Sequence, residues 1–288
     1  MLLWHPVLNK KEVKLAMKTE SKSSPAGLAH NLGVKRGIIA LYGAGGKTTL
    51  LKRLARELVA AGEKVLLTTT TKIFRPAGMP AVINNDLQAT KAALREKFRH
   101  HNLVALGSSL LPGNKFDSIE PGWAKELLHA GPATIIIIEA DGAAHRPIKG
   151  YASFEPVLPR EADLIVPIQG IDALGQTVEK KNVHRPELFA RATGAPFGQP
   201  LTPLHFARSL QQMIARGRSQ SPRARVVPLI NKVASRPEPG LLQALAAELA
   251  PFPLVDRVLF TALEEKIPIK YILALPAGAL KALDGDLK

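Results

Sequence analysis

The chain has 288 residues, of which 46% are hydrophobic, and its 39 lysines and arginines against 24 acidic residues give a net charge of +15. This length can form one large α/β domain or two modest ones, and no apolar run is long enough for a membrane-spanning helix. The chain has no cysteine, which excludes disulfides, zinc–thiolate centres, iron–sulfur clusters and cysteine nucleophiles.

The excess of positive charge predicts an anionic partner, such as a nucleotide, a nucleic acid, an acidic protein or an anionic cofactor. Nucleic acid is the weaker alternative, because aromatic residues make up only 5% of the chain and single-stranded nucleic acid stacks on aromatic side chains. At the N-terminus an apolar start precedes the lysines, which is the reverse of a secretory signal. We therefore expect a cytoplasmic protein.

In chain order, residues 1–33 are expected to form a flexible N-terminal arm, because much of this stretch is polar and rich in small residues. After it, apolar runs alternate with amphipathic stretches. The apolar runs predict strands at 37–42, 64–71, 103–107, 133–142, 162–170, 224–232 and 253–261. The amphipathic stretches predict helices at 48–62, 85–100, 121–131, 186–193, 203–215 and 239–250, the second capped by Asn85 or Asp86.

This alternation predicts an α/β fold in which a mostly parallel sheet has helices on both faces. Together with the glycine cluster described next, it predicts an arrangement like that of P-loop NTPases. We expect one nucleotide-binding domain over residues 34–288, with a helix-rich insertion at about 172–220 that forms a small subdomain.

The glycine cluster after the first predicted strand is typical of a phosphate-binding loop. The full pattern is glycine, four residues, then Gly-Lys-Ser/Thr. Gly46, Lys47 and Thr48 supply its end, but Leu41 stands where the first glycine belongs. A tight turn between a strand and a helix is the alternative, and it explains the glycines but not the lysine and threonine together.

The residues of this cluster have separate expected roles in holding a nucleotide. The helix that follows the turn, which includes Thr49, adds its free N–H groups and positive dipole end. Lys47 is expected to reach the β- and γ-phosphates, and the Thr48 hydroxyl to ligate Mg²⁺. The backbone N–H groups that can face one concavity belong to Gly43, Ala44, Gly45 and Gly46.

Two carboxylates follow the run of four isoleucines in the strand predicted at 133–142. Glu139 and Asp141 come at its carboxyl end, the edge where open parallel sheets bind ligands. A buried carboxylate is costly without a cation nearby, so we expect at least one of them to hold Mg²⁺ and to act with Lys47 in catalysis. The alternative is that Asp141 only forms a turn with Gly142, which leaves Glu139 unexplained.

A base pocket is predicted after the strand at 224–232, where Asn231 and Lys232 match the start of the Asn-Lys-x-Asp pattern that reads guanine. The aspartate position holds Ala234, which cannot accept the hydrogen bonds of guanine, and a pocket without that group loses much of its discrimination. ATP is therefore favoured over GTP. The alternative is that Asn231 and Lys232 simply begin a loop.

Other polar residues near the predicted strand ends are candidates for holding an anionic substrate or sensing the γ-phosphate. Packing in a strand, a solvated basic loop and a helix start are the respective alternatives. The candidates are Thr70, Thr71 and Lys72, then His145, Arg146 and Lys149, then His184 and Arg185.

Three blocks of sequence, taken in order, resemble the YqeC family of accessory proteins of selenium-dependent molybdenum hydroxylases. They are "GAGGKTTLLKRLARELVAAGEKVLLTTTTKI", "IIIIEADGAAHRPIKGYASFEPVLPREADLIVPIQGIDALG" and "VHRPELFA", followed by "LINKV". The resemblance covers about Gly27 to near Leu275 and implies a phosphate-loop protein whose reaction is undefined. It implies a nucleotide role for Gly43 through Thr48 and importance for Thr70, Lys72, Glu139, Asp141, Arg146, His184 and Arg185.

These patterns together predict a Mg²⁺-dependent protein that binds ATP or GTP, hydrolyses it, and acts in the maturation of a selenium-dependent molybdenum hydroxylase. The basic surface would receive an anionic pterin cofactor, a selenium donor or the client enzyme. One alternative is a small-molecule kinase or a Mur-like ATP-dependent ligase, because "GAGGKTT" has the lysine spacing of the ligase loop "GTNGKTT". Others are a non-catalytic, nucleotide-switched binding protein and a nucleic-acid binder, whose affinity would fall with salt.

Overall fold

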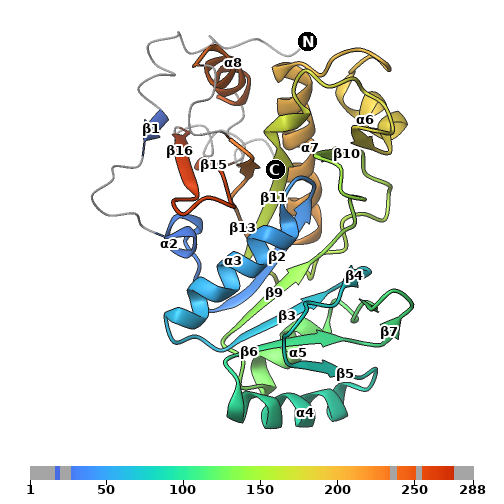
Figure 1. Ribbon diagram of the computed structural model, residues 1–288, viewed down its shortest axis with the longest axis vertical. Helices are drawn as coiled ribbons and strands as arrows, with labels where there is room; N and C mark the ends of the chain where they lie inside the picture. The colour runs from blue at the N-terminus through green and yellow to red at the C-terminus, as the bar shows by residue number, and fades with distance from the viewer. Residues whose placement is uncertain (1–16, 20–26, 234–238, 251–254, 276–288) are drawn as a thin grey trace, which may run out of the picture.

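The alternating apolar and amphipathic stretches fold into one large sheet with helices on both of its faces (Figure 1). The structure is a computed structural model that describes residues 17–19, 27–233, 239–250 and 255–275. The predicted α/β class, with a mostly parallel sheet flanked by helices, is confirmed, and the arrangement is consistent with that of P-loop NTPases.

The central strands of the sheet all run parallel to one another. An antiparallel pair, β16 (Ile269–Ala274) and β1 (Met17–Thr19), extends the edge at β15, and β13 (Arg225–Val226) pairs with part of β11. From one edge to the other, the parallel strands are β5 (Ala81–Ile83), β6 (Leu103–Gly107), β3 (Val65–Thr69), β9 (Ile135–Glu139), β2 (Gly37–Gly43), β11 (Leu164–Gly170), β14 (Leu229–Asn231) and β15 (Arg257–Thr261).

The strand order places the run of isoleucines directly beside the strand that leads to the glycine cluster. β9 lies between β2 and β3, and Glu139 at its end pairs in register with Leu41 on one side and Thr69 on the other. The carboxyl ends of these three strands therefore meet at one edge of the sheet, where open parallel sheets bind ligands.

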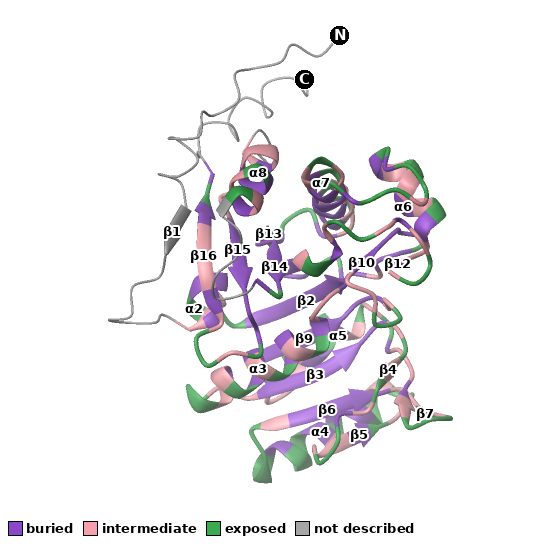
Figure 2. Ribbon diagram, turned by 45° about the horizontal axis from the view of Figure 1, so that its top comes forward, coloured by how far each residue is buried: buried purple, intermediate pink, exposed green. Residues whose placement is uncertain are grey.

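Both faces of the sheet are covered because β9 and its neighbours are apolar on both sides (Figure 2). Ile135 and Ile137 pack in one apolar cluster, and Ile136 and Ile138 pack in a second on the opposite face. Each fully buried side chain of this size stabilises the fold by about 1.5–3 kcal/mol. The helices α2 (Leu28–Leu32) and α3 (Lys47–Ala60) belong to the first cluster, and α4 (Leu87–His100), α5 (Trp123–Ala130), α7 (Pro203–Gln220) and α8 (Pro239–Leu249) to the second.

Several short elements that the sequence did not predict lie beside the large sheet. They include a parallel pair formed by β10 and β12 and an antiparallel group in the order β4, β8, β7. Their bounds, with those of the helices near them, are β4 (Ile73–Phe74), β7 (Leu110–Leu111), β8 (Lys115–Phe116), β10 (Ile148–Lys149), the 3₁₀ helix η1 (Ile171–Ala173), β12 (Val183–His184) and α6 (Pro186–Thr193).

Part of the predicted N-terminal arm belongs to the fold. Leu28 and Leu32 of α2 are fully buried, and Glu57 of α3 accepts hydrogen bonds from the backbone N–H groups of Leu28 and Ala29 at 2.9 and 3.0 Å. Regular structure therefore begins before the predicted boundary at residue 34. The predicted arm otherwise lies outside the described residues, apart from β1.

The described helices differ from membrane-spanning helices in length or in apolar character. None of them combines sufficient length with a sufficiently apolar sequence to cross a lipid bilayer.

Candidate functional site

The turn between β2 and α3 depends on glycines with a left-handed backbone. Gly45 has φ +81° and Gly46 has φ +149°. A Cβ atom on Gly45 would lie 2.4 Å from the backbone nitrogen of Gly170, and one on Gly46 would lie 2.3 Å from Nδ2 of Asn231. The turn therefore packs tightly against the ends of β11 and β14, and larger residues at these two positions would displace it.

The backbone N–H groups of the turn fall into two sets. Gly43 donates to both carboxylate oxygens of Asp141, at 2.9 and 3.0 Å, and Ala44 donates to the carbonyl of Ile168 at 2.8 Å. Within the described part of the chain, no protein acceptor is found for the N–H groups of the next five residues, 45–49. These five groups include the first turn of α3, where a helix has free donors and a positive dipole end.

Lys47 is buried, and its ammonium group is held by oxygen atoms on three sides. Its Nζ atom lies 2.5 Å from the carbonyl oxygen of Gly43, 3.3 Å from Oδ1 of Asp141 and 3.9 Å from Oε1 of Glu139. The side chain of Asp141 is fully buried. The structure thus brings together the lysine and both carboxylates that the sequence selected.

Glu139 and Asp141 have different surroundings although they lie two residues apart. Both oxygens of Asp141 accept hydrogen bonds from the Gly43 N–H group, at 2.9 and 3.0 Å, whereas Oε2 of Glu139 accepts one from the Thr48 hydroxyl at the longer distance of 3.3 Å. Burial raises the pKa of Glu139, and the opposing charge of Lys47 does not cancel that effect. Glu139 therefore gains more than Asp141 from a cation that approaches Thr48.

The side chains present fit a magnesium ion that arrives with a phosphate ligand. Among the described residues, no cluster of three or more histidines or carboxylates could hold a metal by itself. Magnesium usually binds one or two protein oxygens and completes its octahedral shell with phosphate oxygens and waters. Thr48 and Glu139 together offer such a pair.

A buried ion-pair network extends from Asp141 towards α6. Nζ of Lys149 lies 3.0 Å from Oδ2 of Asp141 and 3.1 Å from Oε2 of Glu155, and Arg185 donates to that same Glu155 oxygen. Residues from two distant segments meet here because β10 pairs with β12, with Lys149 opposite His184. Burial raises the pKa of Glu155, but Lys149 and Arg185 outweigh it, so that the pKa lies below its ordinary value.

Glu155 is a member of the site that sequence reasoning missed. It lies in a loop, without a motif or an adjacent apolar strand to draw attention to it. Two signals in the sequence could have found it: it lies within the second block that resembles the YqeC family, and two basic candidates, Lys149 and Arg185, need an acidic partner if they are buried.

Asn231 joins three segments around the glycine turn. Its Nδ2 atom donates to the carbonyl of Gly45 at 2.8 Å, and its Oδ1 atom accepts from the Thr261 hydroxyl at 3.1 Å and from the Leu263 N–H at 3.0 Å. Lys232, with φ +66°, forms an ion pair of 2.6 Å with Asp172 at the surface. Ala234, on which the preference for ATP rests, lies outside the described residues.

The threonine run after β3 lies beside Glu139 and is separated from the glycine turn by β9. Thr70, Thr71 and Lys72 would lie beside the glycine turn if β2 and β3 were neighbours, but β9 lies between these two strands. Thr70 is buried and its hydroxyl donates to the carbonyl of Val157 at 2.6 Å, whereas Lys72 is exposed. The threonine run therefore lies next to Glu139, the last residue of β9, and not next to the glycine turn.

Of the remaining candidates, His184 lies beside the ion-pair network, whereas no contact with the network is found for His145 or Arg146 among the described residues. His145 is exposed with φ +59°, and Arg146 donates to the carbonyl of Lys180 at 2.8 Å. His184 is half-buried, and burial together with the charges of Lys149 and Arg185 lowers its pKa. His184 is therefore neutral at physiological pH.

The fold and the site define an α/β protein in which a lysine-bearing glycine turn opens a helix at the carboxyl edge of a parallel sheet. A family model described as "YqeC protein" matches residues 39–187, just over half of the chain. The chain belongs to the YqeC family.

One relative of this family is known by sequence from Escherichia coli (strain K12), as "Uncharacterized protein YqeC". It is 34% identical to this chain over 176 residues, a stretch that makes up 59% of this chain and 66% of the relative. The alignment thus spans slightly less than two thirds of the relative, and its name assigns no activity.

Proposed function

We propose that this protein binds a nucleoside triphosphate with Mg²⁺ at the turn between β2 and α3 and hydrolyses it. The observation that supports this most directly is the row of five backbone N–H groups, residues 45–49, without a protein acceptor among the described residues. Such a row at the start of a helix suits a phosphate group, because its N–H groups converge on one anion and the helix dipole favours negative charge.

The side chains around the turn would have different roles: one would contact the phosphates, two would hold Mg²⁺, and one would hold the turn in place. Lys47 would exchange its contacts with Gly43 and Asp141 for phosphate oxygens, since its ammonium group already lies beside the end of β2. Thr48 and Glu139 would hold Mg²⁺, which when bound neutralises charge that develops on the transferred phosphoryl group. Asp141 would keep Gly43 and Lys149 in place.

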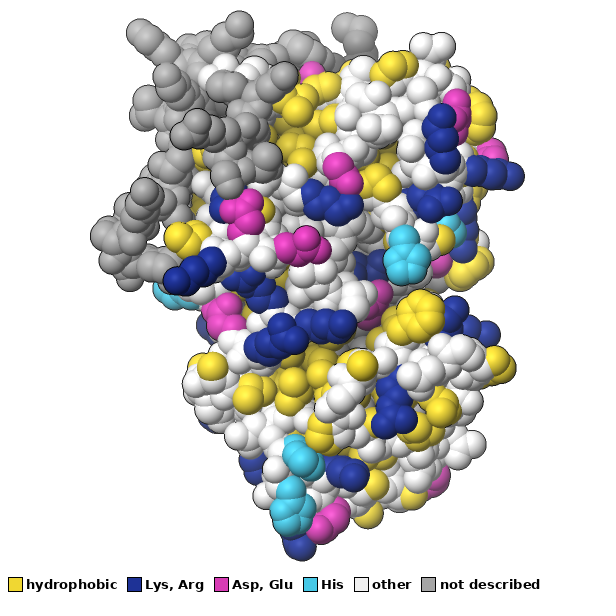
Figure 3. Space-filling view, viewed as in Figure 1, with side chains coloured by type: hydrophobic (Ala, Val, Ile, Leu, Met, Phe, Trp, Pro, Cys, Tyr) yellow, Lys and Arg dark blue, Asp and Glu magenta, His cyan; other side chains and the backbone are white. Residues whose placement is uncertain are grey.

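We further propose that the protein uses this nucleotide in the maturation of a selenium-dependent molybdenum hydroxylase. This role rests on the family resemblance, and the basic character of the chain suits an anionic cofactor or an acidic client. On the face drawn in Figure 3, lysine and arginine side chains are spread among other residues instead of forming one stripe. That distribution favours a small anion or a protein over a nucleic-acid backbone.

Calorimetric titration of ATP and of GTP, with and without Mg²⁺, tests the nucleotide site. We expect Lys47→Ala to weaken binding at least about tenfold, since a charge-assisted contact to phosphate contributes about 1.5–3 kcal/mol. Lys52→Ala removes an exposed lysine from the same helix and should leave binding unchanged. Thr48→Ala should remove the effect of Mg²⁺ while the variant stays folded, because Thr48 is exposed.

Equal affinities of the natural chain, Lys47→Ala and Lys52→Ala for both nucleotides would contradict the proposal. Release of inorganic phosphate, followed with and without the candidate hydroxylase, then tests hydrolysis and its coupling to that client. A rate that does not depend on Lys47 would exclude this site as its source.

A further inference from the structure

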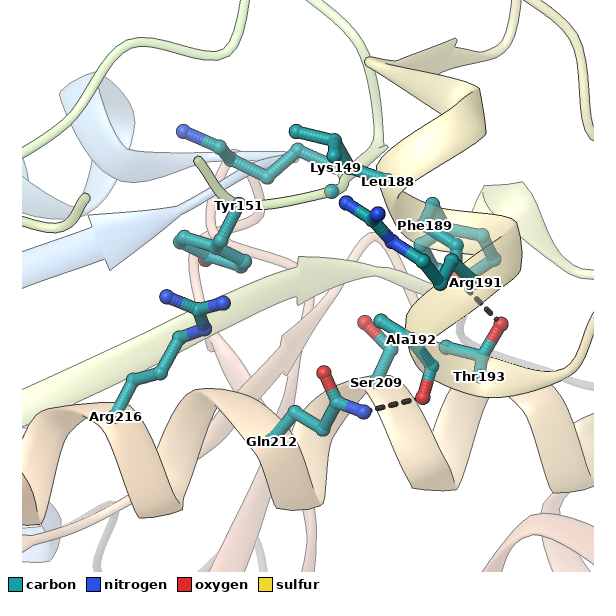
Figure 4. Close-up of a pocket in the computed structure, with 11 residues that line it drawn as sticks. Lys149, Tyr151, Leu188, Phe189, Arg191, Ala192, Thr193, Ser209, Gln212 and Arg216 are labelled. Carbon is teal, nitrogen blue, oxygen red and sulfur yellow. Dashed lines mark hydrogen bonds between the residues drawn. The ribbon is translucent and has the colours of Figure 1, made fainter. Parts of the chain in front are cut away.

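A cavity lies apart from the glycine turn, between α6, α7 and the segment that begins with β10 (Figure 4). Its volume is about 100 Å³. By the same measure a single water needs roughly 10–15 Å³, so the cavity has room for a molecule of several non-hydrogen atoms. The polar side chains that line it are Lys149, Tyr151, Arg191, Thr193, Ser209, Gln212 and Arg216.

A buried hydroxyl group in this lining has no hydrogen-bond partner. Tyr151 is 8% exposed, and within the described part of the chain its hydroxyl finds no partner. Burying a hydroxyl group without a hydrogen bond costs free energy, and native proteins seldom leave one unpaired. Burial also raises the pKa of Tyr151 well above its ordinary value, so the group stays protonated and can donate.

Two further polar side chains of the cavity, Ser209 and Gln212, form hydrogen bonds within the protein and can form more. The Ser209 hydroxyl accepts from Nε2 of Gln169 at 2.5 Å, which leaves its own proton to donate. The side-chain amide of Gln212 donates to the carbonyl of Ala192 from α6, which holds α7 against α6 at the floor of the cavity (Figure 4).

The cavity carries an excess of positive charge. None of the residues that line it is acidic. Lys149 is paired with Asp141 and Glu155, but the exposed Arg191 has no ion-pair or hydrogen-bond partner among the described residues. Arg216 lies over the Tyr151 ring, with its guanidinium carbon 5.7 Å from the ring centroid.

The apolar part of the lining restricts which anion would suit the cavity. Leu188, Phe189 and Ala192 of α6 line it together with the polar groups. A bare inorganic ion would leave these apolar groups without a partner, whereas a short carbon skeleton would bury them. The charges call for an oxyanion, because arginine forks match the oxygen pairs of carboxylate and phosphate groups.

We propose that this cavity binds a small organic anion whose carboxylate or phosphate group pairs with Arg191 and Arg216 and accepts a hydrogen bond from the Tyr151 hydroxyl. The site goes beyond the proposed nucleotide site and does not require it. It adjoins that site through Lys149, which lines the cavity and contacts Asp141 at 3.0 Å. An anion bound here would therefore lie one ion pair away from the carboxylate that holds Gly43.

Calorimetric titrations with malonate and with phosphoglycolate test this site in a Lys47→Ala chain, which weakens phosphate binding at the glycine turn. We expect saturable binding of at least one probe, about tenfold weaker in Lys47→Ala/Arg191→Gln and about fivefold weaker in Lys47→Ala/Tyr151→Phe. Malonate alone indicates carboxylate recognition, and phosphoglycolate alone indicates phosphate recognition. Arg223→Gln, which removes an exposed arginine outside the cavity, is the matched control.

Thermal unfolding of the same variants separates binding from a purely structural role. Because the Tyr151 hydroxyl has no partner among the described residues, Tyr151→Phe should keep or raise Tm without ligand while weakening the probe. No saturable binding, or equal binding by the Arg191, Tyr151 and Arg223 variants, would overturn the proposal. Since every variant in these titrations carries Lys47→Ala, the differences in affinity among them do not arise from phosphate binding at the turn.

Discussion

Glu139 and Asp141 show how two carboxylates of one strand end can be suited to different tasks. The oxygens of Asp141 are engaged by Gly43 and Lys149, so any change in its charge would disturb the turn itself. Glu139 is buried beside Thr48 with a raised pKa, which means that its ionised form is poorly satisfied. The carboxylate whose pKa burial raises is thus the one that faces the start of α3.

The Glu139→Gln variant tests this difference. Because ionising Glu139 is unfavourable in the fold, the amide should not lower Tm, and stability should fall less than in the natural chain as pH rises from 4.5 through the raised pKa of Glu139. We expect the gain in ATP affinity from Mg²⁺ to fall about tenfold, measured by calorimetry. Glu187→Gln, at an exposed position of α6, is the control, and an unchanged Mg²⁺ effect in Glu139→Gln would contradict the assignment.

Single site residues could be predicted from the sequence where few roles other than ligand binding explain a residue type at that position. A lysine followed by threonine after glycines, and carboxylates after a buried strand, pointed to groups that the fold does bring together. Glu155 was missed because its partners come from other segments, and no local pattern records such a contact. That Asn231 touches the base stays a prediction, and in the fold its amide also joins Gly45 to Thr261 and Leu263, a long-range contact that its local pattern does not record.

Among the elements, α7 shows how closely a helix can approach the sheet. Gly217 lies against Tyr42 of β2, whose hydroxyl donates to the carbonyl of Met213 one turn earlier in α7. A Cβ atom at position 217 would lie 2.4 Å from that hydroxyl oxygen and 2.6 Å from Cδ1 of Ile165. Both neighbours are fully buried, so neither can move away freely.

We therefore expect Gly217→Ala to destabilise the protein, although alanine is the better helix former. Overpacking of a closed core costs about 1–3 kcal/mol, which exceeds the gain of about 1 kcal/mol from helix propensity. The measurement is the free energy of unfolding in urea. Gly122→Ala, where a Cβ atom would meet nothing within 4 Å, should change stability by less than about 0.5 kcal/mol. An equal loss of stability at both positions would show that the contact with Tyr42 does not cause the destabilisation.

The long helices and strands were predictable because burying one face of an element places apolar residues at a regular spacing over many positions. The helix at 186–193 and the strand at 103–107 agree with the structure at both ends. Short strands such as β10 and β12 have two residues each, too few to carry a period. The strand predicted at 224–232 is divided into β13 and β14 at residues 227 and 228, since Pro228 has no N–H group for the ladder.

For the molecule as a whole, buried and half-buried charges connect the sheet to the helices that line the cavity between α6 and α7. Lys47, Lys149 and Arg185 alternate with Asp141 and Glu155 along this connection. Removing one member leaves an opposite charge buried without a partner, which is more costly than losing a surface ion pair. Stability should therefore depend on this network more than on exposed pairs such as Lys181 with Glu179.

The acid sensitivity of the protein should reflect Glu155. Its folded-state pKa lies below the ordinary value of 4.5, so its contribution is present above pH 4.5 and is lost as the pH falls through the lower folded-state value. Glu155→Gln should cost about 3 kcal/mol at neutral pH and should make unfolding less dependent on pH in that acid range. Urea unfolding from pH 3 to pH 7, with the exposed Glu161→Gln as control, checks both expectations. A parallel pH profile in all three proteins would contradict them.

The hydrogen bonds of Asn231 affect when the glycine turn can form during synthesis of the protein. The carbonyl it holds belongs to Gly45, which precedes it by 186 residues, and the other groups it binds, at Thr261 and Leu263, come later still. Translation proceeds from the N-terminus, and early segments emerge before their late partners exist. A ribosome-bound fragment that ends before β14 would contain the whole sequence of the glycine turn but would lack Asn231, so the turn would gain this support only after β14 has emerged.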